Sequence, residues 1–169
     1  MKNFARCGYE ELYGNNDKYK REWEANRFAS ELLMPEEMYL NAVKRKTLDG
    51  RMLAETAEYF NVSISSAAIR YSEIGPRETA VVMCKDGIVQ WSRINKDFKY
   101  KFLRKGEKVR GGSYASDYFL GNEIPVCGED IPADAWFWEC YNIDMKERIM
   151  EYLIPFPRYN SLLVLLWMR

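Results

Sequence analysis

The first part of the fold is decided by the stretch from Glu22 to Pro35, EWEANRFASELLMP. Its apolar side chains recur at helical spacing and so share one side of a helix, as Ala25, Phe28, Ala29, Leu32 and Leu33. Pro35 stops this helix and suits the first turn of the next one. We therefore expect a helix from about Tyr19 to Met34, preceded by a loop over 1–17, where glycine and asparagine are frequent.

Three more helices are expected after this stretch. One covers about 36–46 and has acidic residues at its start and basic residues at its end, as the helix dipole favours. The other two cover about 50–60, after Asp49, and 64–74, and Ser63 has the side chain of a good N-cap for the last one. A Gly-Pro pair then ends the helical region.

The pattern changes to strands after Pro76. Two runs rich in β-forming residues, 80–84 and 88–91, flank Asp86 and Gly87, which predicts a β-hairpin with a tight turn. Further strands are expected over 136–141, 148–154 and 161–168, and a short helix over 113–120. The sequence therefore predicts an α+β fold, with a helical N-terminal part followed by a β-rich part.

The composition narrows the class of protein. The chain has 169 residues, with 25 lysines and arginines balanced by 25 aspartates and glutamates, so it exerts no long-range attraction on nucleic acid or an anionic membrane. The most apolar run, 162–168, is too short to cross a membrane. Four cysteines form no CxxC pair, which is typical of reduced thiols. We expect a cytoplasmic protein without a membrane partner.

Glu22 and Asn26 are four positions apart and share one helix face. In HExxH enzymes whose third zinc ligand is a glutamate, that ligand comes from a separate helix, and a nearby polar side chain can hold a histidine ligand in place. The pattern Glu-x-x-Ala-Asn-x-Phe-Ala, followed by Leu-Leu-Met-Pro, resembles the signature of the ImmA/IrrE zinc metallo-endopeptidases. The resemblance implies that Glu22 is the third metal ligand and Asn26 the residue supporting a ligand. Glu24 is less favoured, since the family accepts other residues at its position.

The chain contains no histidine. The family's remaining ligands are the two histidines of an HExxH helix, whose glutamate activates the attacking water. We therefore expect that zinc does not bind tightly to this chain alone and that the chain alone does not hydrolyse peptides. Three explanations stay open: a gene fragment or late start, a degenerate relative, or a split protein whose upstream, HExxH-bearing half is a separate chain.

Residues 53–71 resemble a helix–turn–helix, a segment that ImmA/IrrE proteins commonly carry after their peptidase helices. A DNA-reading helix exposes several polar or basic side chains to base edges. Here the second helix offers Ser65, Ser66 and Arg70, and Glu73 would repel phosphate. The sequence therefore favours packing or partner docking over contact with DNA.

The region from about Glu78 onward resembles the C-terminal domain of longer ImmA/IrrE proteins, which is similar to a GAF-type sensor in some members. Five aromatic residues are candidates for lining a ligand pocket, although an ordinary core is the more frequent role of such residues: Trp91, Tyr118, Phe119, Trp136 and Trp138. We expect three parts: a metallopeptidase (zincin) remnant over 1–46, a helix–turn–helix-like pair over 47–75, and a β-rich, GAF-like domain over 76–169.

The family resemblance also implies a function. Full-length members are cytosolic zinc endopeptidases that cut a helix–turn–helix transcriptional repressor and so release genes of stress responses, prophages or other mobile elements. This chain would be an incomplete member of such a system. The alternatives are a non-catalytic module that senses a ligand or docks a repressor, and one half of a split peptidase.

Overall fold

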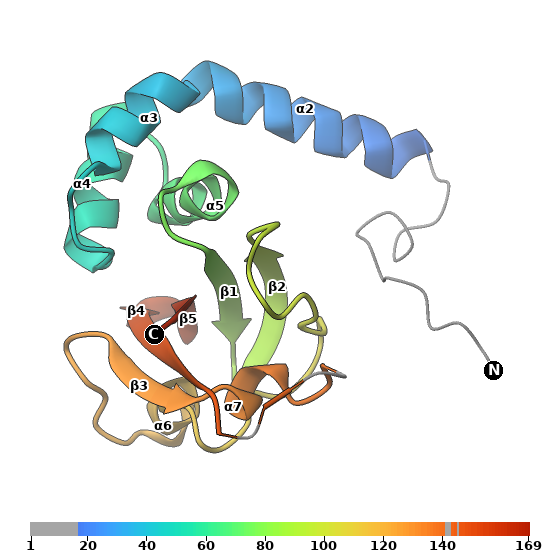
Figure 1. The fold of residues 1–169 in the computed structure, drawn as a ribbon, viewed down its shortest axis with the longest axis vertical. Coiled ribbons are helices and arrows are strands. Elements are labelled where there is room, and N and C mark those ends of the chain that lie inside the picture. The colour runs from blue at the N-terminus through green and yellow to red at the C-terminus, as the bar shows by residue number, and fades with distance from the viewer. Residues whose placement is uncertain (1–16, 141–142, 145) are drawn as a thin grey trace. The chain divides into compact units, whose positions relative to one another are not determined.

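The structure is a computed structural model that describes residues 17–140, 143–144 and 146–169 (Figure 1). The chain divides into two compact units, Met1–Pro35 and Glu36–Arg169. In the first unit the described part is one helix, α2 (Asp17–Leu33), which confirms the helix expected there. The loop expected over 1–17 lies outside the described residues except for its last position.

The second unit opens with three helices, α3 (Glu36–Val43), α4 (Gly50–Phe60) and α5 (Ile64–Ile74). Asp49 caps α4, because its carboxylate accepts the N–H of Met52 at 2.7 Å. Ser63 caps α5, because its hydroxyl accepts the N–H of Ser66 at 3.0 Å. These local bonds explain why both helices begin where the sequence predicts. The helix α3 is shorter than expected and ends at Val43.

A single five-stranded antiparallel sheet follows, with the order β2-β1-β5-β4-β3. Its strands are β1 (Thr79–Lys85), β2 (Ile88–Ile94), β3 (Glu129–Pro132), β4 (Arg148–Phe156) and β5 (Ser161–Met168), with a 3-10 turn at Pro157–Tyr159 before the last. Asp86 and Gly87 both have positive φ angles, 52° and 74°, which is typical of the tight hairpin turn expected at this place. The strands predicted over 148–154 and 161–168 are also confirmed.

The central strand β5 is apolar and buried over nearly its whole length, because both faces of the sheet are covered. On one face, Leu162 and Val164 belong to the main core together with Phe137. On the other face, α5 packs against β1 and β2 (Figure 1), and Gly50 at the start of α4 lies close to the side chain of Tyr152 on β4. The structure is thus a mixed fold, with most helices before the strands.

Two short helices, α6 (Tyr114–Leu120) and α7 (Asp134–Phe137), pack on the core face. The first confirms the short helix expected over 113–120. The second shows that the strand expected over 136–141 is wrong as far as Cys140, and Tyr141 lies outside the described residues. The apolar run fits either element, since a buried strand and a buried helical turn have the same composition.

The strand β3 was not expected from the sequence. It has two acids and a proline, which are rare in strand interiors. As an edge strand it pairs on one side only, with β4, and can therefore tolerate Pro132.

Candidate functional site

The residues implied as a metal ligand and its support lie on α2. Glu22 and Asn26 are one helical turn apart, and Asn26 is exposed, while the side chain of Glu22 is not among those described. Elsewhere on this helix, Phe28 and Leu32 are exposed by 70% and 68%. These two apolar side chains are four positions apart, so they share one face of α2.

The donors present do not fit a zinc ion. A catalytic zinc site takes three protein ligands. Among the residues that the structure describes, no group of three histidine, cysteine, aspartate or glutamate side chains is placed to hold a metal. The sequence contains no histidine, so Glu22 and Asn26 cannot complete an HExxH-type ligand set within these 169 residues.

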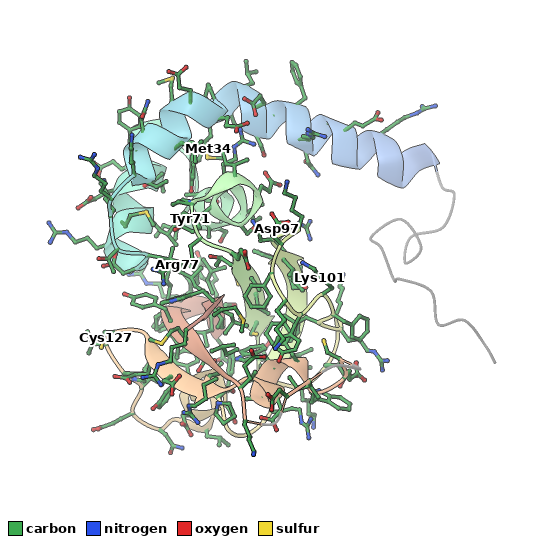
Figure 2. The ribbon with its side chains drawn as sticks, in the orientation of Figure 1. Met34, Tyr71, Arg77, Asp97, Lys101 and Cys127 are labelled. Atoms are coloured by element: carbon green, nitrogen blue, oxygen red, sulfur yellow. The ribbon has the colours of Figure 1, made fainter. Side chains whose placement is uncertain are left out.

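The second helix of the expected helix–turn–helix, α5, is largely buried. It packs against α4, β1 and β2, and Arg70 is only 4% exposed and lies 3.6 Å from the carboxylate of Glu73. Tyr71, on the same helix, is also buried (Figure 2). Glu73 is the one side chain of α5 in the exposed class. An exposed acid repels phosphate, so α5 has the surface of a packing helix rather than of a base-reading one.

Four of the five aromatic residues considered as a pocket lining lie in the core, against it, or in a small hollow beside it. Trp136 is buried in the core, and Tyr118 and Phe119 pack against that core with their rings 5.1 Å apart. Trp136 and Trp138 line one hollow, which has a volume of about 20 Å³. A hollow of that size holds about one water molecule.

The most unusual polar group of the core is Glu151 on β4, which is fully buried. Its Oε1 accepts the indole N–H of Trp136 at 2.8 Å, and its Oε2 accepts the backbone N–H of Tyr114 at 2.6 Å. Burial raises the pKa of Glu151 to about 7, opposed by these hydrogen bonds, with a further small increase from Asp117. The carboxyl group thus ties α6 and α7 to the sheet.

Glu151 was missed by sequence reasoning, although a signal was present. Alternate residues of a strand share one face, and Glu151 lies between Ile149 and Leu153 in that alternation. An acid at an apolar position of a strand is a candidate buried group.

The helices α3 and α4 form an open groove with a volume of about 430 Å³. Two large side chains in it are solvent-exposed, Met38 by 48% and Tyr59 by 66%. Lys46 and Glu55 form an ion pair of 3.2 Å in the same lining. The lining is completed by Asn41, Ala42 and Thr56. Exposed methionine and tyrosine are enriched where proteins bind one another.

The fold is that of an α+β protein, with most of its helices before an antiparallel sheet. Residues 5–72 match the family model of the IrrE N-terminal-like domain, Peptidase M78. The match covers less than half of the chain, and it confirms the predicted resemblance to the ImmA/IrrE family. No curated protein matches the chain. Within the described residues, no helix has both the length and the apolar character needed to cross a membrane.

Proposed function

We propose that this chain is a catalytically incomplete relative of the ImmA/IrrE metallopeptidases, within a system whose family role is cleavage of a helix–turn–helix repressor. One observation carries the proposal. The helix α2 lies in the segment matched to the IrrE N-terminal-like domain and has Glu22 and Asn26 one turn apart, in a chain without histidine. The stress-response, prophage or mobile-element context follows from the family resemblance alone.

The proposed role of Glu22 depends on ligands from elsewhere. When bound, zinc supplies a Lewis acid that polarises the scissile carbonyl and lowers the pKa of a bound water. The carboxylate of Glu22 would be one of its three protein ligands, and Asn26 would orient a histidine ligand by a hydrogen bond. Neither residue replaces the missing histidines or the general base, so we expect no hydrolysis by the chain alone.

Zinc titration by calorimetry tests this proposal. We expect only weak heats, identical for the full chain and its Glu22→Ala variant, because one carboxylate does not hold zinc tightly. A stoichiometric site with submicromolar affinity that is lost in Glu22→Ala would contradict catalytic incompleteness. Circular dichroism of both proteins serves as the control for folding.

The split-peptidase alternative is supported by the exposed Phe28 and Leu32 on one face of α2, which are of the kind that packs against another helix. To test this alternative, a separate chain that carries an HExxH helix is mixed with this chain, and the zinc titration is repeated on the mixture. If the two chains form a split enzyme, a tight zinc site that depends on Glu22 will appear only in the mixture. Its absence would leave the chain as a non-catalytic module.

A second candidate function is docking of a repressor helix in the groove between α3 and α4. The exposed Met38 and Tyr59 on the two sides of this groove favour it over ligand sensing, because the hollow on the core face is small. The antiparallel sheet with α6 and α7 on one face is compatible with a GAF-like domain, and the aromatic residues Trp136, Tyr118 and Phe119 belong to or pack against its core.

The docking surface is tested with a purified helix–turn–helix repressor. We expect Tyr59→Ser to weaken binding about tenfold or more, as loss of a central aromatic anchor does. Tyr159→Ser is the matched control, since Tyr159 is also 70% exposed but lies outside the groove. Equal binding by both variants would exclude the groove.

A further inference from the structure

The positive charge of this neutral chain is concentrated in one segment, Lys96–Arg110, which follows β2. It contains seven lysines and arginines and only two acids, so the rest of the chain has more acidic than basic residues. Figure 2 marks Asp97 and Lys101 near the start of this segment. A local concentration of one sign of charge attracts a polyanion even when the whole protein is neutral.

The segment is held firmly against the second unit. Phe98 and Tyr100 are fully buried and lie next to Phe137, at ring distances of 5.4 Å and 5.1 Å. Further on, the N–H of Gly106 donates to the carbonyl of Val89 at 2.8 Å, and an isolated bridge pairs Lys108 with Ile88. The basic side chains therefore project from a fixed backbone, which lowers the entropy lost on binding.

Local acids neutralise only part of this charge. Glu107 and Glu139 both pair with Arg104, at 3.3 Å and 3.4 Å. Lys105, Lys108 and Arg110 are exposed and form no ion pair with an acid in the part of the chain that the structure describes. Three cations are thus available at one edge of the sheet.

An aromatic surface lies among these cations. Trp138 is 42% exposed, and the guanidinium of Arg110 stacks over its indole ring at 4.5 Å from the centroid. Arg104, Lys108, Arg110 and Trp138 line the same shallow hollow, together with the two acids that pair with Arg104. Its volume of about 20 Å³ is too small to enclose a metabolite. The ligand that fits is an extended polyanion carrying planar rings, with a ring on Trp138 and its phosphates on the cations.

We propose that Lys105, Lys108, Arg110 and Trp138 form a binding surface for single-stranded nucleic acid. The surface is independent of α2 and of the peptidase resemblance. It also differs from the helix–turn–helix-like pair, whose second helix is buried. Duplex DNA is the poorer ligand for it, because paired bases are stacked inside the duplex and do not reach an aromatic side chain.

Fluorescence anisotropy with a labelled 12-nucleotide oligo-dT, at several salt concentrations, tests the proposal on the full chain. Three phosphate contacts predict a slope of log affinity against log salt of about −2. Changing Lys108→Gln together with Arg110→Gln should make the slope less steep by about 1.4. Trp138→Ala should weaken binding about tenfold with little change in slope, and Trp138→Phe should retain most of the affinity.

Two comparisons make the result decisive. Lys44→Gln with Arg45→Gln removes the same charge from an exposed site outside the segment, and this variant should bind as the unchanged protein does. Thermal unfolding midpoints of all variants establish that they are folded. The proposal is overturned by unchanged binding in the Lys108/Arg110 variant, by equal affinity for a duplex of the same length, or by equal affinity for polyglutamate.

Discussion

Replacement of Glu151 by alanine is expected to lower the free energy of unfolding by about 3–5 kcal/mol. Glu151 is fully buried and accepts one N–H from Trp136 and one from Tyr114. Alanine leaves both donors buried without an acceptor, at about 1–3 kcal/mol each, and creates a cavity under α6 and α7. Urea unfolding followed by tryptophan fluorescence measures the loss, and Trp136 itself reports on the altered site.

The Glu151→Gln variant is the matched control, because it keeps the size of the side chain and cannot ionise. The pKa of Glu151 is raised from 4.5 to about 7, mainly by burial. A raised carboxyl pKa contributes stability that is present below the unfolded value and is lost as pH rises through the folded value. Relative to Glu151→Gln, the free energy of unfolding of the unchanged protein should therefore fall by up to about 3 kcal/mol between pH 4.5 and pH 7.

This pH window is unusually clear in this chain. No histidine titrates within it, and the pKa values of Glu55 and Glu147 are shifted downward, away from it. If the difference in the free energy of unfolding between the unchanged protein and Glu151→Gln stayed constant from pH 4.5 to pH 8, the carboxyl group would not be desolvated. An ordinary surface substitution changes the free energy of unfolding by about 0.5 kcal/mol. A loss below about 1 kcal/mol in Glu151→Ala would therefore contradict the burial of this side chain.

The second large effect is expected for Phe137→Ala, at about 3–5 kcal/mol of lost stability. Phe137 lies at the end of α7, is fully buried, and contacts the rings of Phe98 and Tyr100. Its removal opens a cavity between α7, the basic segment and the sheet. The free energy from urea unfolding is the measurement, and Phe137→Leu should be affected less because it refills part of the volume.

The matched control for this variant is Phe28→Ala, since Phe28 is 70% exposed. A surface phenylalanine contributes little to folding, and a change of about 0.5 kcal/mol or less is expected. If Phe137→Ala lowered the free energy of unfolding as little as Phe28→Ala, α7 would not be anchored in the core. The packing that fixes the backbone of Lys105, Lys108 and Arg110 would then also be in question.

The parts of the fold that were predicted from the sequence depend on short-range chemistry. Ser63 caps α5 through a residue three positions away, and Asp86-Gly87 makes its turn from its own backbone preferences. Such signals lie within a few residues and can be read locally. The match of residues 5–72 to the IrrE N-terminal-like domain confirms that the pattern around Glu22 also carries family information.

The parts that were missed depend on contacts between distant residues. The run Ala135-Trp136-Phe137 forms a helical turn rather than a strand, because the core face of the sheet has room for a covering turn there. The strand β3 exists because β4 offers it an edge, even though its own residues are poor strand formers. Neither fact is encoded in the local pattern.

The sequence by itself determined the order of helices and strands up to β2 and the last two strands. It also determined the resemblance to the ImmA/IrrE family and the lack of histidine. Only the tertiary structure decided that Arg70 is buried, that Glu151 is a core residue, and that Arg110 stacks on Trp138. The reason is physical: capping and turn formation act over a few residues, whereas burial and ring stacking require segments that the chain brings together only on folding.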